Sequence, residues 1–129
     1  MWSGARENEA GIRVPPRGGT ADGFESQFGV NHLGTFGLSG LLLEKLAEGQ
    51  APRVVITASM AHRNGRIDFD DINAEESYSR WGRYAMSKLA NLLHMYVLDP
   101  RLRASPSPII AVVCQPIVLY TVPNNACPH

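Results

Sequence analysis

Two short apolar runs constrain the fold of this chain more than any other feature, because each follows a long segment with helical character. The first run covers residues 54–58 and the second covers residues 109–114, and both are rich in β-branched side chains. Runs of this kind are typical of strands in a parallel sheet that helices cover on both faces. The order helix, strand, helix, strand predicts an α/β fold built on a doubly wound parallel sheet.

The two segments that precede these runs, residues 22–48 and 80–99, are predicted to be helices. Asp22 suits an N-cap, with Glu25 three positions later, as in a capping box. The second helix is expected to end at Asp99, because the proline that follows disfavours helical conformation in the residue before it. Apolar side chains of the first helix cover more than one stripe, so this helix is expected to be buried in the core or against a partner subunit.

Glycines and prolines divide the chain into three parts. Residues 1–21 contain two prolines and two glycines in adjacent pairs, and residues 115–129 contain three further prolines. Both ends are therefore predicted to be irregular, which leaves residues 22–114 as the folded domain. Three glycines of the first helix either permit close approach of another backbone, mark a bend, or simply weaken the helix. They are Gly34, Gly37 and Gly40.

Composition argues against several classes of function. Lys and Arg number 12, as do Asp and Glu, so the formal net charge is zero and nucleic acid is not expected as a partner. No apolar run reaches the about 20 residues that a membrane span needs, and no signal-like segment opens the chain. The two cysteines, Cys114 and Cys127, do not suggest a disulfide framework and fit a reduced, cytoplasmic location.

Metal binding is not expected either. The four histidines lack the spacing of a zinc site. The acidic positions 68, 70 and 71 resemble the start of a calcium loop. However, Ile72 and Asn73 fall where such a loop needs an oxygen ligand and a glycine, so a solvated acidic loop is predicted instead.

Tyr84 and Lys88 lie four residues apart inside the second predicted helix, so their side chains share one face. An ammonium group beside a phenol in a low-dielectric cleft favours the phenolate. Lowering a phenol pKa from about 10 to about 7 requires roughly 4 kcal/mol of such stabilisation. The result would be an acid or base suited to moving a proton on or off an alcohol. Spacing alone favours a plainer interpretation, a half-buried tyrosine beside a solvated lysine.

Several segments in the correct order resemble a short-chain dehydrogenase/reductase of the retinol-dehydrogenase-like or WW-domain-oxidoreductase-like branch. The similarity covers about residues 8–121. Residues 20–34 resemble the family's fourth helix, and residues 53–62 resemble its fifth strand with the catalytic serine. Residues 65–73 resemble the loop that follows, and residues 84–91 resemble the catalytic helix. The resemblance implies a partial Rossmann-like sheet, formed by the C-terminal half of the fold.

Taken position by position, the resemblance implies four catalytic residues. Tyr84 would be the acid/base, and Lys88 would lower its pKa and bond the nicotinamide ribose. Ser59 would hold the substrate oxygen, and the backbone carbonyl of Asn31 would hold a water that links Lys88 to solvent. A strand-end cap is the alternative role for Ser59, and a helix-bending polar residue is the alternative for Asn31.

The implied reaction interconverts an alcohol and a carbonyl on a small molecule, with NAD or NADP as cofactor. Donors aimed at the oxygen that gains charge lower the barrier to hydride transfer, while the cofactor supplies the hydride. The residues implied to contact the cofactor are Asn8, Ala10, Gly11, Tyr84, Lys88 and Thr121.

The chain also departs from the family pattern. The phosphate-binding turn G-x-x-x-G-x-G does not occur among its 12 glycines, and no strand is expected before residue 20 to carry it. The first three strands and the last one are therefore expected to be missing, so the chain is interpreted as truncated at both ends. Whether it is an enzyme stays open. The alternative is a catalytically impaired fragment that self-associates through the helices at 22–48 and 80–99.

Overall fold

The parallel sheet expected from the sequence is present. The computed structural model describes the backbone of residues 3–8 and the whole of residues 11–115. Three parallel strands form the sheet in the order β1-β2-β3. They are β1 (Ser3–Asn8), β2 (Gln50–Thr57) and β3 (Ile110–Cys114). This arrangement confirms the α/β class and the partial Rossmann-like sheet.

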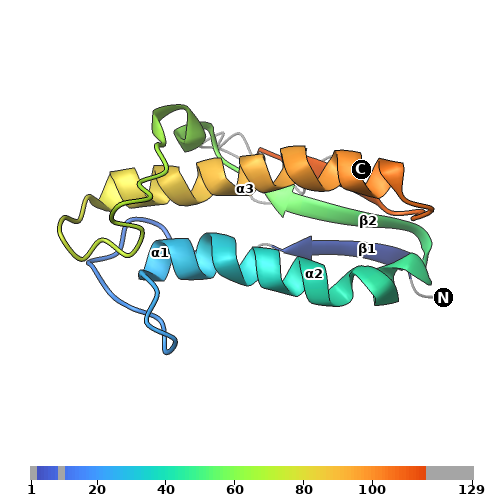
Figure 1. The fold of residues 1–129 in the computed structure, drawn as a ribbon, viewed down its shortest axis with the longest axis horizontal. Coiled ribbons are helices and arrows are strands. Elements are labelled where there is room, and N and C mark those ends of the chain that lie inside the picture. The colour runs from blue at the N-terminus through green and yellow to red at the C-terminus, as the bar shows by residue number, and fades with distance from the viewer. Residues whose placement is uncertain (1–2, 9–10, 116–129) are drawn as a thin grey trace, which may run out of the picture.

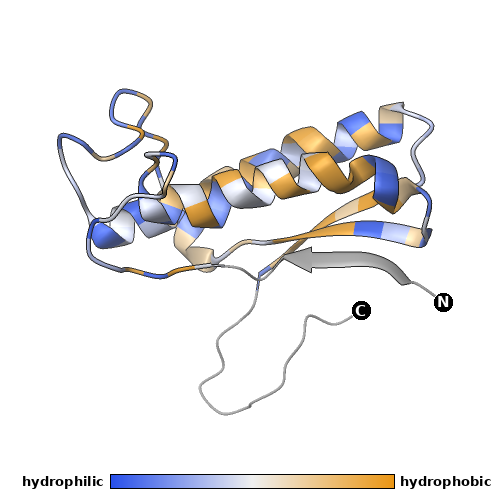
Figure 2. Ribbon diagram, turned by 90° about the horizontal axis from the view of Figure 1, so that it is seen from below, coloured by the Kyte–Doolittle hydropathy of each residue, from blue (hydrophilic) through white to orange (hydrophobic). Residues whose placement is uncertain are grey.

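The two long helices, α2 (Gly34–Ala47) and α3 (Arg80–Ala104), form a second layer on one face of the sheet, which Figure 2 shows from below. The short helix α1 (Ser26–Phe28) and the π-helix η1 (Gly29–Leu33) lead into α2, and the 3-10 helix η2 (Met60–Asn64) packs against α3. In Figure 1 the two long helices run in the same direction, opposite to the strands. The carboxyl ends of β1 and β2 therefore lie at the same end of the molecule as the start of α3.

The core lies between the sheet and the two long helices. The side of β2 that faces the helices contributes Val54 and Ile56, which are buried against Leu46, Met95 and other apolar side chains of the helices and β3. Fully burying one such side chain contributes about 1.5–3 kcal/mol. On the opposite face of the sheet, Ile110 and Val112 of β3 are 50% and 36% exposed. The expected cover on both faces is therefore seen on one face only within the described residues.

The prediction that residues 1–21 are irregular is wrong for their first part. Ser3–Asn8 form β1, which pairs with β2 from Ser3 opposite Gln50 to Asn8 opposite Ile56. Local sequence did not reveal this strand because it lacks an apolar or alternating pattern. The backbone ladder from β2, a long-range contact, holds it in the sheet. Beyond it, residues 11–21 have no helix or strand apart from an isolated bridge between Gly19 and Glu25.

Both predicted helices have different limits from those expected. The first begins at Ser26 instead of near Asp22, because the Glu25 side chain caps it by accepting hydrogen bonds from the backbone N–H groups of residues 27 and 28. The second continues through Pro100 to Ala104. A proline inside a helix costs about 3 kcal/mol, and burial of Leu102, only 7% exposed, offsets much of this cost.

The glycines of α2 do not permit a close backbone approach within the described structure. A Cβ atom added at Gly37 or Gly40 would meet nothing within 4 Å. The real irregularity lies one turn earlier, in η1, where the backbone N–H of Gly34 bonds the carbonyl of Gly29. Single π-turns inside helices occur frequently at functional sites, and this one contains Asn31.

The prediction for the thiol of Cys114 is also corrected by the structure. The sequence suggests a reduced thiol, whereas Cys114 is disulfide-bonded in the structure. The other half of this bond lies outside the described residues.

Candidate active site

The four predicted catalytic residues gather at the carboxyl end of the sheet. Ser59 follows β2 directly and caps η2, Tyr84 and Lys88 lie in the first turns of α3, and Asn31 lies in η1. In open α/β sheets, ligands bind in the crevice outside the carboxyl ends of the strands. The structure therefore brings these residues to the edge where the fold places ligand sites.

Lys88 is the most informative residue of this group because it is buried without a carboxylate partner. It is 8% exposed, and none of the ion pairs among residues 11–115 includes it. Desolvation by burial lowers the pKa of Lys88. Its ammonium lies 5.8 Å from the centre of the Tyr84 ring. The expectation of a solvated lysine is thus wrong, and a buried cation next to a half-buried phenol is typical of a functional site.

The carbonyl of Thr57, at the end of β2, holds Lys88 in place. Lys88 Nζ donates to this oxygen at 3.4 Å, and Asn91 Nδ2 donates to it at 3.2 Å. The Asn91 amide also donates to the carbonyl of Asn31 at 2.9 Å. Asn91, which is 2% exposed, therefore connects the lysine's acceptor to the π-turn. One local signal could have revealed Asn91, because it follows Lys88 by three positions and so shares its helix face.

Asn31 is anchored through both its side chain and its backbone. Its side chain accepts from the N–H of Ile12 at 2.8 Å and donates to the carbonyl of Ile12 at 2.9 Å and to Ser87 Oγ at 3.1 Å. Its carbonyl accepts from Asn91 and from Thr35 Oγ1. A carbonyl oxygen has two lone pairs, so the predicted water would have to share this acceptor with two protein donors. The water relay remains a prediction.

Ser59 has a hydroxyl that is only partly used. Its Oγ accepts from the N–H of Ala61 at 3.3 Å, which satisfies one acceptor position of a helical cap and leaves the hydroxyl hydrogen free to donate. Its carbonyl accepts from the backbone N–H of His62 and contacts the His62 ring nitrogen at 2.6 Å. Within residues 11–115 no hydrogen bond joins the side chains of Ser59, Tyr84 and Lys88. Catalytic hydrogen bonds are often absent from unliganded sites and form with the substrate.

A close approach of two backbones brings the serine loop onto the catalytic helix. Gly65 follows η2, and a Cβ atom at this position would lie 2.6 Å from the carbonyl oxygen of Ala85 in α3. Only a residue without a side chain allows this contact. Gly65 thus helps determine how near the loop that carries Ser59 lies to Tyr84.

Arg13 reaches the site from the loop after β1, and no sequence signal pointed to it. Its guanidinium carbon lies 5.0 Å from the centre of the Trp81 ring and 5.9 Å from that of Tyr84. Trp81 and Tyr84 themselves pack edge to face, with 6.3 Å between ring centres. Arg13 therefore forms cation–π contacts with the predicted catalytic tyrosine and its neighbour.

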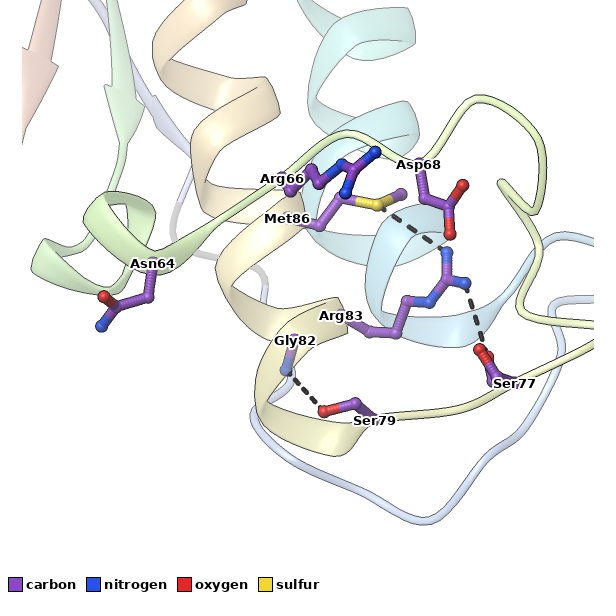
Figure 3. A pocket seen from close by; sticks show the side chains of 8 residues that line it. All are labelled: Asn64, Arg66, Asp68, Ser77, Ser79, Gly82, Arg83 and Met86. Atoms are coloured by element: carbon purple, nitrogen blue, oxygen red, sulfur yellow. Dashed lines mark hydrogen bonds between the residues drawn. The ribbon is translucent and has the colours of Figure 1, made fainter.

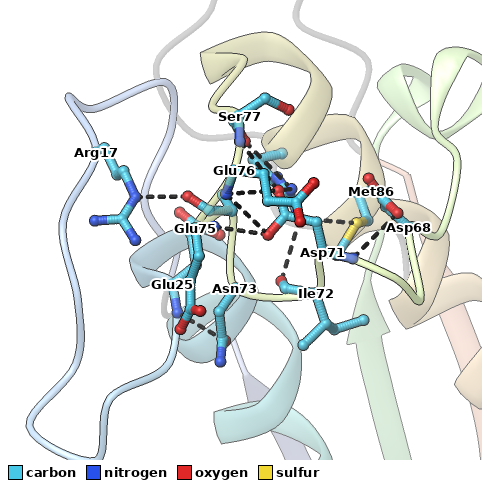
Figure 4. Close-up of polar contacts among 12 residues, drawn as sticks. Arg17, Glu25, Asp68, Asp71, Ile72, Asn73, Glu75, Glu76, Ser77 and Met86 are labelled. Atoms are coloured by element: carbon cyan, nitrogen blue, oxygen red, sulfur yellow. Dashed lines mark hydrogen bonds and ion pairs between the residues drawn. The ribbon is translucent and has the colours of Figure 1, made fainter.

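The acidic loop is built differently from the prediction. Asp71 is buried, and its carboxylate accepts from the N–H groups of Glu75, Glu76 and Ser77 and pairs with Arg83 (Figure 4). Desolvation alone would raise the pKa of Asp71, but these backbone donors and Arg83 outweigh it, so the pKa is lowered. The loop is thus held by a buried carboxylate instead of being fully solvated, and no cluster of metal-ligating side chains occurs in the described part of the chain.

A polar cavity of about 290 Å³ adjoins this loop (Figure 3). Arg66, Asp68, Arg83 and Met86 are among its lining residues. None of the four predicted catalytic residues lines it, so it is separate from the candidate active site.

The predicted cofactor contacts are only partly visible. Asn8 is the last residue of β1, and Gly11 lies in the exposed loop that follows. Ala10 and Thr121 lie outside the described residues. Lys88 fits a ribose contact, because an ammonium has three donors and the described residues accept from only one of them.

The fold and this site define part of a Rossmann-like α/β domain with a tyrosine and a lysine at the carboxyl edge. No family model matches the chain. Its sequence is 48% identical to human retinol dehydrogenase 12 over 98 residues, and this aligned stretch covers 76% of the chain and 31% of that protein. Mouse retinol dehydrogenase 12 is 46% identical over 120 residues, covering 92% of the chain and 37% of that protein. Human polyprenol dehydrogenase is 41% identical over 118 residues, which cover 88% of the chain and 36% of that protein.

A crystal structure of an uncharacterized protein from Mycobacterium Paratuberculosis has a TM-score of 0.78 and 46% identity, covering 88% of this chain and 41% of that one. The predicted resemblance is confirmed, and the chain is homologous to short-chain dehydrogenases/reductases of the retinol-dehydrogenase-like branch. It spans about a third of the length of the curated relatives it matches. In the part of the chain that the structure describes, none of the helices combines the length and the apolar character that a membrane span requires.

Proposed function

We propose that the chain carries the acid/base part of an NAD(P)-dependent oxidoreductase of the short-chain type, which interconverts an alcohol and a carbonyl. The observation that carries this proposal is that Lys88 is buried without a carboxylate partner, with its ammonium 5.8 Å from the centre of the Tyr84 ring. The relatives are named retinol and polyprenol dehydrogenases, and these names point to the same reaction class.

The chain's own residues would act on the proton and the substrate oxygen. Tyr84 donates a proton to the oxygen during reduction and removes it during oxidation. The hydroxyl of Ser59, whose hydrogen is unused, donates to the same oxygen and stabilises the charge that develops there. Lys88 places a positive charge beside the Tyr84 ring and keeps two donors for the ribose. A nicotinamide cofactor supplies or accepts the hydride when bound.

The second group of residues positions the lysine. The Thr57 carbonyl accepts from the Lys88 ammonium at the end of β2, and the Asn91 amide donates both to this carbonyl and to that of Asn31. A buried ammonium without such an acceptor would be costly to desolvate. This neutral acceptor stabilises the charge without neutralising it, which leaves its field available to Tyr84.

Tyr84→Phe tests this assignment, with Tyr96→Phe as its matched control because Tyr96 lies on the same helix and is 68% exposed. The full chain is titrated with NADPH and NADH by fluorescence, and retinal reduction is followed with each variant. Loss of general acid catalysis lowers the rate about 10²–10⁴-fold in the Tyr84 variant only. Absence of cofactor binding at millimolar concentration, or equal rates for both variants, would refute the proposal for this chain.

A second candidate function is self-association through the outer surface of α2 and α3. Phe36 and Leu41 on α2 and Leu93 and Val97 on α3 are 45–84% exposed, and a groove of about 320 Å³ lies among several of these side chains. Apolar patches of this kind mark interaction sites. We propose a second copy of this chain as the occupant.

Sedimentation velocity of the full chain tests the association. A Leu93→Asp, Val97→Asp variant is expected to sediment as a monomer while the unaltered chain sediments as a dimer. Met60→Asp is the matched control, because Met60 is an apolar side chain of similar exposure, 45%, in η2 and outside this surface. A folded, strictly monomeric unaltered chain would contradict this candidate.

A further inference from the structure

We propose that His32 is a positioning residue for the reaction, because its ring holds the Asn91 amide in the orientation that supports the catalytic lysine. The inference rests on the proposed function, since it takes Lys88 as the cation that serves Tyr84. It adds a residue of η1 that acts only through Asn91 and is not one of the four predicted catalytic residues.

The nitrogen of the Asn91 side chain uses both of its hydrogens within the site. It donates to the carbonyl of Asn31 at 2.9 Å and to that of Thr57 at 3.2 Å, and a side-chain amide has two N–H donors. The Thr57 carbonyl is also the acceptor for the Lys88 ammonium, at 3.4 Å. Reversing the amide would place its oxygen against two carbonyl oxygens, which have no hydrogen to donate. Only one orientation of Asn91 therefore joins η1 to the end of β2.

The same orientation determines which nitrogen of His32 carries a hydrogen. The oxygen of the Asn91 amide faces the His32 ring, with 3.1 Å between Oδ1 and Nδ1. Because an amide oxygen can only accept, Nδ1 is the protonated nitrogen of the ring and donates to this oxygen. Burial lowers the pKa of His32 more than the bond to Asn91 raises it, so the ring is neutral near pH 7 and Nε2 has no hydrogen.

Among residues 11–115, His32 is the donor that satisfies the Asn91 oxygen. Asn91 is 2% exposed, so water has little access to this oxygen. A buried acceptor that loses its donor is costly, and rotation of the amide toward another donor would break its bonds to the two carbonyls. Without His32, the Thr57 carbonyl would therefore lose a donor that fixes it, and Lys88 would shift with its acceptor.

Aromatic neighbours hold the ring of His32 where it makes this bond. Its centre lies 5.1 Å from that of Phe28 and 6.2 Å from those of Phe36 and His94. The ring also lines the groove of about 320 Å³, whose other lining side chains are apolar apart from His94. His32 thus combines a packing contact with a hydrogen bond, and each role needs its own variant.

Two substitutions of His32 separate these roles. His32→Phe keeps an aromatic ring but has no donor. His32→Asn loses the ring but keeps an N–H at the position of Nδ1, since both nitrogens are bonded to Cγ. His94→Phe is the matched control, because His94 lines the same groove and packs against His32. The buried Nδ1 of His94 has no hydrogen-bond partner in the described part of the chain.

Retinal reduction by the full chain with NADPH is measured for each variant, after circular dichroism has shown that the variant is folded. His32→Phe is expected to lower kcat roughly 10- to 100-fold, as misplacement of a group by about 1 Å can do. The KM for retinal should stay unchanged, because the lysine acts on proton transfer and not on retinal binding. His32→Asn should retain most of the kcat, and His94→Phe all of it. A role in packing alone predicts the reverse order of the two His32 variants, and that order, or an unchanged kcat in His32→Phe, would overturn the inference.

The tautomer of His32 can be measured in the unaltered chain, independently of turnover. Long-range ¹H–¹⁵N spectra distinguish the protonated from the unprotonated nitrogen of a neutral imidazole, and His94→Phe helps to assign the His32 signals. The expected result is a hydrogen on Nδ1, with Asn91 amide protons that exchange slowly with solvent and exchange faster in His32→Phe. A hydrogen on Nε2 would overturn the inference even if no variant folded. If the unaltered chain reduced no retinal, the proposed function would fail, while these spectra would still decide whether His32 holds the Asn91 amide.

Discussion

Replacing Gly65 by alanine isolates the contact that joins the serine loop to the catalytic helix. The backbone of Gly65 has φ −78° and ψ 146°, a conformation that alanine adopts without strain. The effect of the substitution is therefore steric. The added Cβ atom would lie 2.6 Å from the carbonyl oxygen and 3.0 Å from the carbonyl carbon of Ala85, and 3.0 Å from the Cβ atom of Leu89.

Two of these three neighbours are backbone atoms of α3, so the clash cannot be relieved by a rotamer change. Either the helix or the loop must move by several tenths of an ångström, and forced overpacking of this kind costs typically about 1–3 kcal/mol. Gly37→Ala is the matched control. Gly37 lies inside α2, where a Cβ atom meets nothing within 4 Å, so alanine there is expected to stabilise the chain by about 0.5–1 kcal/mol.

Urea unfolding of the full chain, followed by circular dichroism, measures both changes. The expected result is opposite shifts of the midpoint, downward for Gly65→Ala and upward for Gly37→Ala. Because the displaced loop carries Ser59, turnover by Gly65→Ala should fall as well. If Gly65→Ala unfolded at the same urea concentration as the unaltered chain, the close contact between loop and helix would be refuted.

Two further predictions concern charged groups. Asp71→Asn should lower the urea midpoint, because it removes the anion that pairs with buried Arg83. The contribution of Asp71 is fully present above its unfolded pKa of about 3.8 and is lost as the pH falls through its lower folded value. The difference in midpoint between the two proteins should therefore narrow in acid, and a constant difference would contradict this account. Lys88→Met should be inactive yet more stable near neutral pH, because burial lowers the pKa of Lys88 and the charged form opposes folding. Stability of the unaltered chain should rise with pH between the folded pKa and 10.5, so the advantage of Lys88→Met shrinks in that window. If Lys88→Met were no more stable than the unaltered chain at neutral pH, Lys88 would be solvated.

Sequence patterns predicted the elements whose signals are local. β2 and β3 were expected from β-branched runs, and α3 from its periodicity, because a strand or helix interior is encoded by neighbouring residues. The grouping of Ser59 with Tyr84 and Lys88 was implied by the family resemblance alone, since spacing relates only Tyr84 and Lys88 on one helix face. The predicted first and last residues of the helices were less accurate. Pro100 lies inside α3, where the burial of Leu102 outweighs the local preference for a helix end.

The residues that sequence analysis missed act through contacts between distant segments. Arg13 and Tyr84 are separated by most of the folded chain, and the Asn91 amide meets the Asn31 carbonyl only because η1 packs against α3. Asp71 was expected in solvent, and its burial depends on Arg83 from another element. Neither composition nor spacing encodes such pairs.

The order and chemistry of the residues therefore determined by themselves the α/β class, the parallel sheet and the candidate tyrosine and lysine, because helical and strand periodicity place side chains on faces without reference to the rest of the chain. Tertiary structure alone decided that β1 joins the sheet, that Lys88 is buried without a carboxylate and that Arg13 lies over the Tyr84 ring. The physical reason is that burial, desolvation and cation–π contact are properties of groups brought together from distant positions, and they arise only when the layers pack.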